Sequence, residues 1–113
     1  MKPRPARLQA LTAIARLRAD RALSDLAEAC GACAALERDL DRMAAERRRH
    51  LGAAPAPGQG AALARWLRAD AARRRDLLGK LARNRARRQV LEDAARQEEG
   101  RRQALDRLSG QAS

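Results

Sequence analysis

Aromatic and β-branched residues are nearly absent from this chain. Its 113 residues include no Phe, no Tyr, one Trp, one Ile and one Val. A compact core of this size normally depends on several aromatic side chains, each of which buries a large apolar area. One Ile and one Val are also too few β-branched residues to build a sheet. These scarcities argue against a layered globular fold and against strands.

Long apolar runs are missing as well. No stretch approaches the roughly 18 apolar residues that a membrane-spanning helix needs. The basic N-terminal segment MKPRPARLQALTAIARLRAD is interrupted by Arg16 and Arg18, which argues against a secretory signal. The two cysteines lie close together, which fits a reducing compartment better than a disulfide framework. We therefore expect a cytoplasmic protein with no membrane insertion.

Alanine, leucine and arginine dominate what remains, together with Asp, Glu and Gln. This composition favours long helices and coiled coils. The formal net charge is +11, from 25 basic and 14 acidic residues. Such a charge attracts anionic partners, which include nucleic acid, acidic proteins and anionic membrane surfaces. The sign of the charge alone does not choose among them.

The first half of the sequence carries a heptad pattern of small and apolar residues, sustained over about five heptads. The pattern reads Leu8, Thr12, Ala15, Ala19, Ala22, Leu26, Ala29, Cys33, Leu36, Leu40 and Met43. Pro3 and Pro5 mark its start. Gly31 lies inside it, at a cost of roughly 1 kcal/mol relative to Ala. The spacing predicts one helix from about residue 5 to about residue 50.

The second half carries a similar but more polar pattern, which predicts a helix from about residue 61 to about residue 108. It reads Leu63, Leu67, Asp70, Arg74, Leu77, Leu81, Asn84, Arg88, Leu91, Ala95, Glu98, Arg102 and Leu105. Apolar pairs alternate with polar pairs, in which an acceptor precedes an arginine by four residues on one helical face. Polar layers of this kind cost stability but fix the register, or else they face a partner outside this chain.

Between the two patterns lies LGAAPAPGQG, residues 51 to 60. Pro55 and Pro57 stop helix propagation, and Gly52, Gly58 and Gly60 supply the permissive backbone that a reversal needs. We predict a single all-α domain, in which two long helices form an antiparallel coiled-coil hairpin. The runner-up geometry is an open, nearly straight rod whose second helix pairs with another molecule.

The hairpin predicts a register in which residue i lies near residue 112 − i. This register brings an acidic cluster of the first helix beside an arginine cluster of the second. The clusters are Glu37, Asp39 and Asp41, and Arg73, Arg74 and Arg75.

Few residues point to catalysis or metal binding. Cys30 and Cys33 form a Cys-x-x-Cys motif, but a structural zinc site needs four ligands and the only histidine is the distant His50. A thioredoxin-like pair would follow a strand. We therefore interpret the cysteines as small apolar residues that pack in the helix interface. His50 fits the C-terminal end of the first helix, where positive charge is favoured. We expect no enzymatic activity and no cofactor.

Two further features suggest interaction surfaces. The segment RRRDLLGKLARNRARR, residues 73 to 88, is the densest positive stretch, with Asp76 as its only acid. It could grip nucleic acid, but its arginines are distributed around the helix and no aromatics interleave for base stacking. We prefer a solvated face partly neutralised by the first helix. Trp66 has two open interpretations, as a cap on the hairpin interior near the bend or as an interface anchor.

The segments LQALTAIARLRADRALSDLAEA and WLRADAARRRDLLGKLARNRARRQVLEDAARQEEGRRQALDRL resemble the FliJ family of flagellar export proteins and their relatives in virulence type III secretion. The resemblance runs from about residue 8 to about residue 108. It implies an antiparallel two-helix coiled coil similar to the central stalk of rotary ATPases. It also implies a non-enzymatic stalk or chaperone-like adaptor at the inner-membrane export apparatus.

The resemblance further implies partners. The ends of the two helices would enter the central pore of a hexameric export ATPase. The candidates for this contact are Arg4, Arg7, Leu8, Arg101, Arg102 and Arg107. Contacts with the membrane-embedded export gate and with export chaperones would fall on the exposed face around Trp66, Asp70 and Arg73.

Two alternatives stay open. The first is a basic nucleic-acid-binding coiled coil, whose affinity would weaken steeply with salt. The second is a scaffold whose polar seam is satisfied by self-association.

Overall fold

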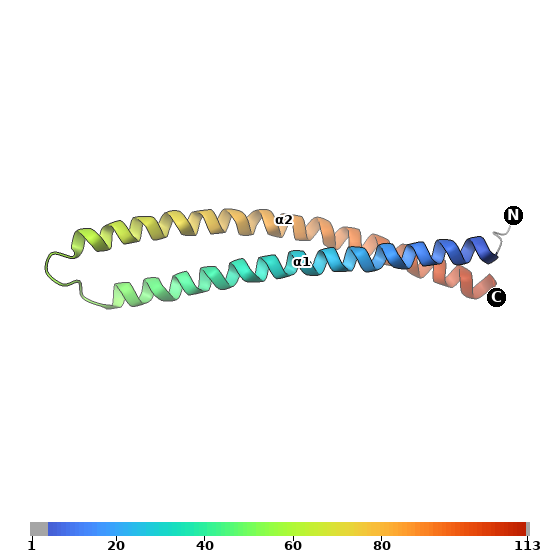
Figure 1. Ribbon diagram of the computed structural model, residues 1–113, viewed down its shortest axis with the longest axis horizontal. Helices are drawn as coiled ribbons and strands as arrows, with labels where there is room; N and C mark the ends of the chain where they lie inside the picture. Colours follow the sequence, from blue (N-terminus) through green and yellow to red (C-terminus); the bar gives the residue numbers. More distant parts are fainter. Residues whose placement is uncertain (1–4, 113) are drawn as a thin grey trace. The chain divides into compact units, whose positions relative to one another are not determined.

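The chain forms two long α-helices. The computed structural model describes residues 5 to 112 and, within that range, contains no strand. Helix α1 is Pro5–Gly52, with 48 residues, and helix α2 is Gly60–Ala112, with 53 residues. The two helices run antiparallel and are joined by a short turn (Figure 1). The predicted antiparallel helical hairpin is confirmed. The second helix continues four residues beyond its expected end.

The described chain divides into two compact units, each of which pairs part of α1 with part of α2. The terminal unit joins α1 up to Cys30 with α2 from Ala86 onward. The turn unit spans Gly31–Arg85 and contains the connection between the helices. Each unit has its own narrow interior.

Both interiors consist mainly of the predicted heptad positions, and most of the side chains there are small. In the terminal unit the buried residues are Leu8, Thr12, Ala15, Ala19, Ala29 and Ala95. In the turn unit they are Cys33, Asp70 and Leu81. Thr12 satisfies its hydroxyl within its own helix, where Oγ1 donates to the carbonyl oxygen of Leu8 at 2.8 Å. Every position of the predicted heptad pattern on the first helix is buried or half-buried, whereas Arg74 of the pattern on the second helix is exposed.

The turn explains the cluster of proline and glycine residues. The amide of Gln59 donates to the carbonyl oxygen of Ala56 at 3.0 Å, which closes a four-residue turn with Pro57 and Gly58 at its centre. Gly58 has φ of 86°, and this combination matches a type II turn. Gly52 and Gly60 are instead the last residue of α1 and the first residue of α2. Of the three glycines, only Gly58 needs the left-handed conformation.

The expected register of 112 − i is wrong for side-chain contacts. In the turn unit, Glu37 binds Arg85 at 3.2 Å instead of facing Arg75. In the terminal unit, Arg16 binds Asp106 at 3.2 Å instead of facing Arg96. Both partners lie farther from the turn than expected. Side chains lean toward the N-terminus of their helix, so in an antiparallel pair α1 side chains lean away from the turn and α2 side chains lean toward it.

The predicted pairing of acidic and basic clusters also fails. Asp39 pairs with Arg42 on its own helix. Asp41 forms no ion pair within residues 5–112, nor do any of Arg73, Arg74 and Arg75. Asp41 and the three arginines are exposed. The contact of His50 with Trp66, where the expected partner of His50 was Ala62, shows that the helices also face each other about four residues away from the expected register.

Candidate partner-binding surfaces

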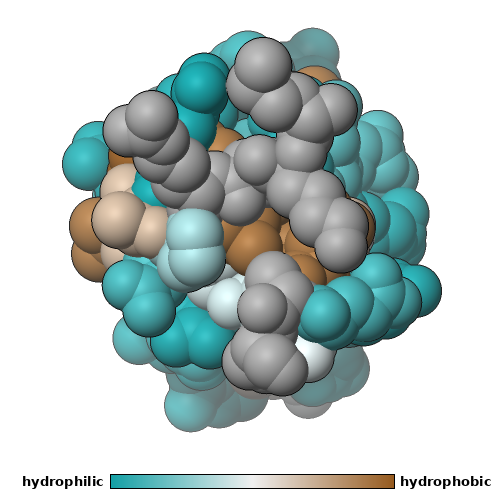
Figure 2. All heavy atoms as spheres, turned by 90° about the vertical axis from the view of Figure 1, so that its right-hand side faces the viewer, coloured by the Kyte–Doolittle hydropathy of each residue, from teal (hydrophilic) through white to brown (hydrophobic). Residues whose placement is uncertain are grey.

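The candidate ATPase-contact residues of the terminal unit fall into two environments. Arg7, Arg101 and Arg107 are exposed. Leu8 is only 4% exposed and packs in the helix interface, so its side chain is not available to a partner. Arg4 lies outside the described residues. Figure 2 views this end of the molecule and shows hydrophobic patches between hydrophilic side chains.

Arg102 is held by carboxylates of its own helix. Its guanidinium donates to Glu99, with Nε 3.1 Å from Oε1 and 3.0 Å from Oε2. It also donates through Nη1 to Asp106 Oδ2 at 2.7 Å. The hydrogen bond from Arg102 lowers the pKa of Glu99, and the same bond raises the pKa of Arg102. Asp106 accepts a further bond from Arg16 of α1, so this cluster ties the two helices together on one side of the terminal unit.

The polar pairs expected at spacing four on α2 do not form. Glu98 binds Arg101 at 3.1 Å, Arg88 approaches Glu92 at 3.8 Å, and the amide of Asn84 donates to the carbonyl oxygen of Lys80 at 2.9 Å. Seam positions face the other helix, so their long side chains bend outward to partners beside the seam.

An apolar groove runs along the side of the terminal unit away from Glu99, and we call it the terminal groove. It consists of two adjoining hollows of about 280 and 620 Å³ that share Ile14, Arg18 and Glu98. Its apolar walls come from both helices. They include Leu11, Ile14 and Leu17 of α1, and Leu91, Ala94 and Leu105 of α2.

Glu98 leaves one acceptor unused in this groove. Its Oε1 accepts from Arg101, while its Oε2 is buried and has no hydrogen-bond partner among the described residues. Leaving a buried acceptor unpaired costs about 1–3 kcal/mol. The groove was not predicted from the sequence, although Leu11 and Ile14, followed by Arg18, Arg21 and Asp25, form a second heptad pattern beside the first.

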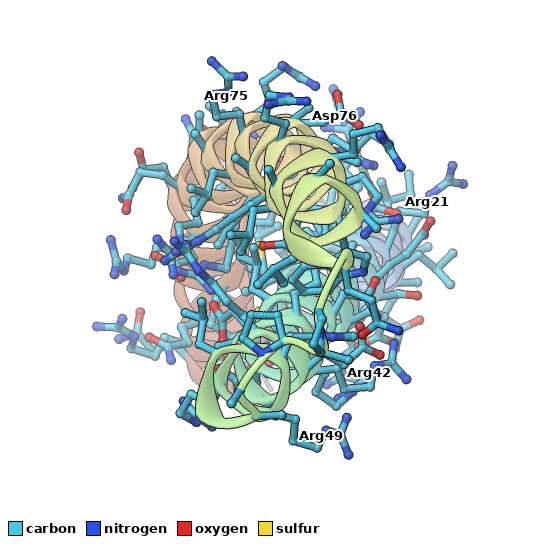
Figure 3. The ribbon with its side chains drawn as sticks, turned by 90° about the vertical axis from the view of Figure 1, so that its left-hand side faces the viewer. Arg21, Arg42, Arg49, Arg75 and Asp76 are labelled. Carbon is cyan, nitrogen blue, oxygen red and sulfur yellow. The ribbon has the colours of Figure 1, made fainter. Side chains whose placement is uncertain are left out.

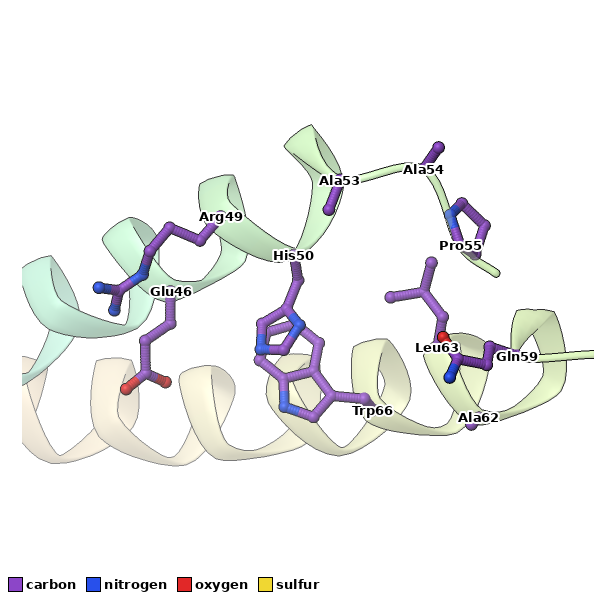
Figure 4. Close-up of a pocket in the computed structure, with 10 residues that line it drawn as sticks. All are labelled: Glu46, Arg49, His50, Ala53, Ala54, Pro55, Gln59, Ala62, Leu63 and Trp66. Atoms are coloured by element: carbon purple, nitrogen blue, oxygen red, sulfur yellow. The ribbon is translucent and has the colours of Figure 1, made fainter. Parts of the chain in front are cut away.

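In the turn unit, a hollow of about 880 Å³ lies beside the turn (Figure 4). The rings of His50 and Trp66 face each other there, with centroids 4.0 Å apart and planes inclined by 38°. Glu46, Arg49, Pro55 and Leu63 also line the hollow. His50 lies in the last turn of α1, as predicted. The contact supports the interpretation of Trp66 as a cap on the helix pair.

The exposed face expected around Trp66, Asp70 and Arg73 is not continuous. Asp70 is 2% exposed, because it occupies a seam position that faces α1. It forms no ion pair within residues 5–112. Trp66 is partly exposed and Arg73 is exposed. Only these two of the three candidates can reach a partner.

The helix segments next to the turn carry a cluster of arginines without ion-pair partners, which we call the turn arginines. They are Arg47, Arg48, Arg49, Arg65, Arg68, Arg73, Arg74 and Arg75. Within the described chain, none of them approaches a carboxylate closely enough for an ion pair. Figure 3 shows Arg49 and Arg75 pointing away from the helices. Their charge is therefore available to an anionic partner.

The two cysteines differ in accessibility. Cys33 is 1% exposed and packs in the seam of the turn unit, whereas Cys30 is exposed in the terminal unit. Both are free thiols. Residues 5–112 contain no group of three His, Cys, Asp or Glu side chains that could hold a metal ion.

Comparison of the chain with protein-family models, curated proteins and solved structures gives no match. The class of protein that the fold defines is a two-helix antiparallel hairpin. Over the described residues, neither helix carries a segment that is both long enough and apolar enough to span a bilayer.

Proposed function

We propose that this chain is a non-enzymatic stalk or adaptor of a flagellar or type III protein export apparatus, where it binds and regulates the export ATPase. The observation that supports the proposal is the antiparallel pairing of α1 and α2, which is the architecture that the resemblance to the FliJ family implies. The chain acts in the cytoplasm, at the periphery of the inner-membrane export apparatus.

The ATPase contact uses the exposed arginines of the terminal unit. Arg7, Arg101 and Arg107 offer charged groups that can bind acidic side chains inside the ATPase ring. Exposed ion pairs are individually weak, which suits a contact that must form and break as the ring works. Leu8 and Arg102 contribute by holding the helix ends together.

The export gate and the export chaperones contact the turn unit. Trp66 and Arg73 supply an amphipathic ring and a free cation for these contacts. Asp70 acts from the interior, as part of the seam that positions Trp66 one helical turn away.

The experiment measures ATP hydrolysis by the purified hexameric export ATPase with and without this protein. We expect co-purification of the two proteins and faster hydrolysis. The double variant Arg7→Glu/Arg107→Glu should abolish both effects. The matched control Arg65→Glu/Arg68→Glu makes the same charge change beside the turn and should retain them. Absence of a complex with the wild-type protein would overturn the proposal.

A second candidate function is nucleic-acid binding, which the unpaired turn arginines favour. Each phosphate contact adds about 0.9 to the slope of log affinity against log salt on duplex DNA. For this function, Arg65→Glu/Arg68→Glu should weaken binding and lower the slope, while Arg7→Glu/Arg107→Glu should have the smaller effect. The same two variants thus separate the two functions by opposite results.

A further inference from the structure

The length of the terminal groove and the spacing of the residues in its walls fit a binding site for a third helix. Its α1 wall runs from Leu11 to Asp25, which is about four turns, or roughly 22 Å at 1.5 Å per residue. Leu11, Ile14 and Leu17 are 42%, 50% and 70% exposed. Large apolar side chains gathered in one groove of this kind mark interaction sites more often than isolated ones do.

Both walls repeat at heptad spacing. On α1 the repeat is formed by Leu11, Ile14, Arg18, Arg21 and Asp25, and on α2 by Ala94, Glu98, Arg101 and Leu105. Two parallel rows of this period form the holes that receive the apolar side chains of another helix. The groove therefore fits an amphipathic helix better than an extended peptide.

The charges at the rim select the occupant. Arg18 has no ion-pair or hydrogen-bond partner within the described chain, and Arg21 approaches Asp25 only to 3.9 Å. Arg101 is exposed on the opposite wall and binds Glu98. The whole chain has a formal net charge of +11, so a second copy would be repelled. A helix with acidic residues beside its apolar stripe would instead be attracted.

We propose that the terminal groove binds an amphipathic helix of a partner protein, with acidic residues flanking its apolar stripe. The apolar stripe covers Leu11, Ile14 and Leu17. Its acidic flank pairs with Arg18 and Arg21.

The other side of the terminal unit differs from the groove. Leu23 and Leu26 line a hollow there together with Glu99 and Gln103. Glu99 binds Arg102, and Arg102 binds Asp106, which also binds Arg16 of α1. The polar groups of that side thus satisfy one another. The proposed helix site is therefore specific to one side of the pair, and it does not depend on an export function.

The test measures fluorescence anisotropy of a labelled peptide with the full-length protein. The acidic probe is a designed peptide of about four heptads, with Leu and Ile at the seam positions and Glu at the flanking positions. The comparison probe replaces each Glu with Lys. We expect the acidic probe to bind at least about tenfold more tightly than the basic probe, a difference of about 1.4 kcal/mol.

Two matched variants locate the site. Ile14→Ser in the groove should weaken the affinity for the acidic probe about tenfold or more. Leu23→Ser on the other side should change this affinity less than about twofold. Ile14 and Leu23 are both 50% exposed on α1. Leu17→Ser, at an even more exposed position, serves if Ile14→Ser does not fold. Arg18→Ala should weaken binding and reduce its salt dependence.

Three results would overturn the proposal. The first is no binding of the acidic probe, and the second is equal loss in Ile14→Ser and Leu23→Ser. The third is a dimer in sedimentation equilibrium that Ile14→Ser dissolves, because the occupant would then be a second copy. Failure to stimulate the export ATPase, with probe binding intact, would instead count against the proposed function alone.

Discussion

The imidazole of His50 packs against the indole of Trp66 at a tilted angle, with ring centroids 4.0 Å apart, and this contact joins the end of α1 to the start of α2. Trp66 is the only aromatic residue of the Phe, Tyr and Trp class in the chain. This contact places the indole ring of Trp66 against α1, next to the turn that joins the two helices (Figure 4).

Removing this ring should loosen the turn unit. We expect Trp66→Ala to lower the free energy of unfolding by about 2 kcal/mol, because a large and partly buried ring loses its contacts. Trp66→Phe should cost less than half as much. Urea unfolding followed by circular dichroism measures both. Leu51→Ala, at an exposed position beside the turn, should stay within about 0.5 kcal/mol of wild type.

Replacing the buried Asp70 should stabilise the protein. Asp70→Leu would extend the leucine pattern of Leu63 and Leu67 and remove a buried carboxylate that has no ion pair in the described chain. Apolar replacements of buried charged groups often stabilise, here by about 1–2 kcal/mol. Asp76→Leu is the control, since Asp76 is exposed and pairs with Lys80 at 3.4 Å. A loss of stability in Asp70→Leu would mean that the carboxylate has a favourable interaction in the folded state.

Replacing two of the glycines with alanine should change the stability of the protein in opposite directions. A Cβ at Gly31 would meet nothing within 4 Å, and alanine in an exposed helix interior is favoured by about 1 kcal/mol. At Gly58 the same space is open, but φ of 86° strains any other side chain, at about 1–2 kcal/mol. In thermal unfolding, the melting temperature of Gly31→Ala should therefore lie above that of the wild type, and the melting temperature of Gly58→Ala should lie below it. A Gly58→Ala variant as stable as wild type would contradict the turn geometry, and a destabilised Gly31→Ala variant would contradict the open space at that position.

The two thiols should react at different rates. Cys30 is exposed and Cys33 is 1% exposed. A thiol reagent should therefore label one cysteine rapidly in the folded protein and the second only after unfolding. Cys30→Ser should abolish the rapid phase, and Cys33→Ser should leave it unchanged. Rapid labelling of Cys33 would show that the seam of the turn unit opens easily.

The lowered pKa of Glu99 should make the stability of the folded protein depend on pH in the acidic range. Its bond to Arg102 lowers this pKa below the ordinary value of 4.5, so the carboxylate stabilises the folded state above that value. The stabilisation is lost as the pH falls through the lowered pKa. The melting temperatures of the wild-type protein and of the Glu99→Gln variant should therefore differ at pH 7 and become equal in acid. A difference that persists unchanged in acid would exclude the Arg102 bond as its source.

Much of the fold could be predicted from the spacing of small residues alone. Ala15, Ala19 and Ala29 recur at heptad distance, and burial follows such spacing because a helix presents those positions to one neighbour. The proline and glycine cluster likewise identified the reversal. Neither inference needed information about where individual side chains end.

The surfaces were harder to predict, because they depend on the reach of long side chains. Glu37 meets Arg85 and not Arg75, because the helices face each other away from the expected register and the long side chains reach farther along them. Asp70 was predicted to share an exposed face with Trp66 and Arg73, although its heptad position places it inside. The groove around Ile14 was overlooked because Arg18 and Arg21 interrupt its apolar residues, and only the structure shows that Leu91 and Ala94 complete its wall.

The small side chains of the two interiors also set the thermal behaviour of the molecule. Cys33 is the largest fully buried side chain within residues 5–111. Little hydrocarbon meets water when such a seam opens, so the heat capacity change of unfolding should fall below the about 12 cal/mol/K per residue of ordinary globular domains. A small heat capacity change makes the free energy of unfolding depend less on temperature. The helices should therefore separate over a broad temperature range on warming, and the protein should also resist cold denaturation.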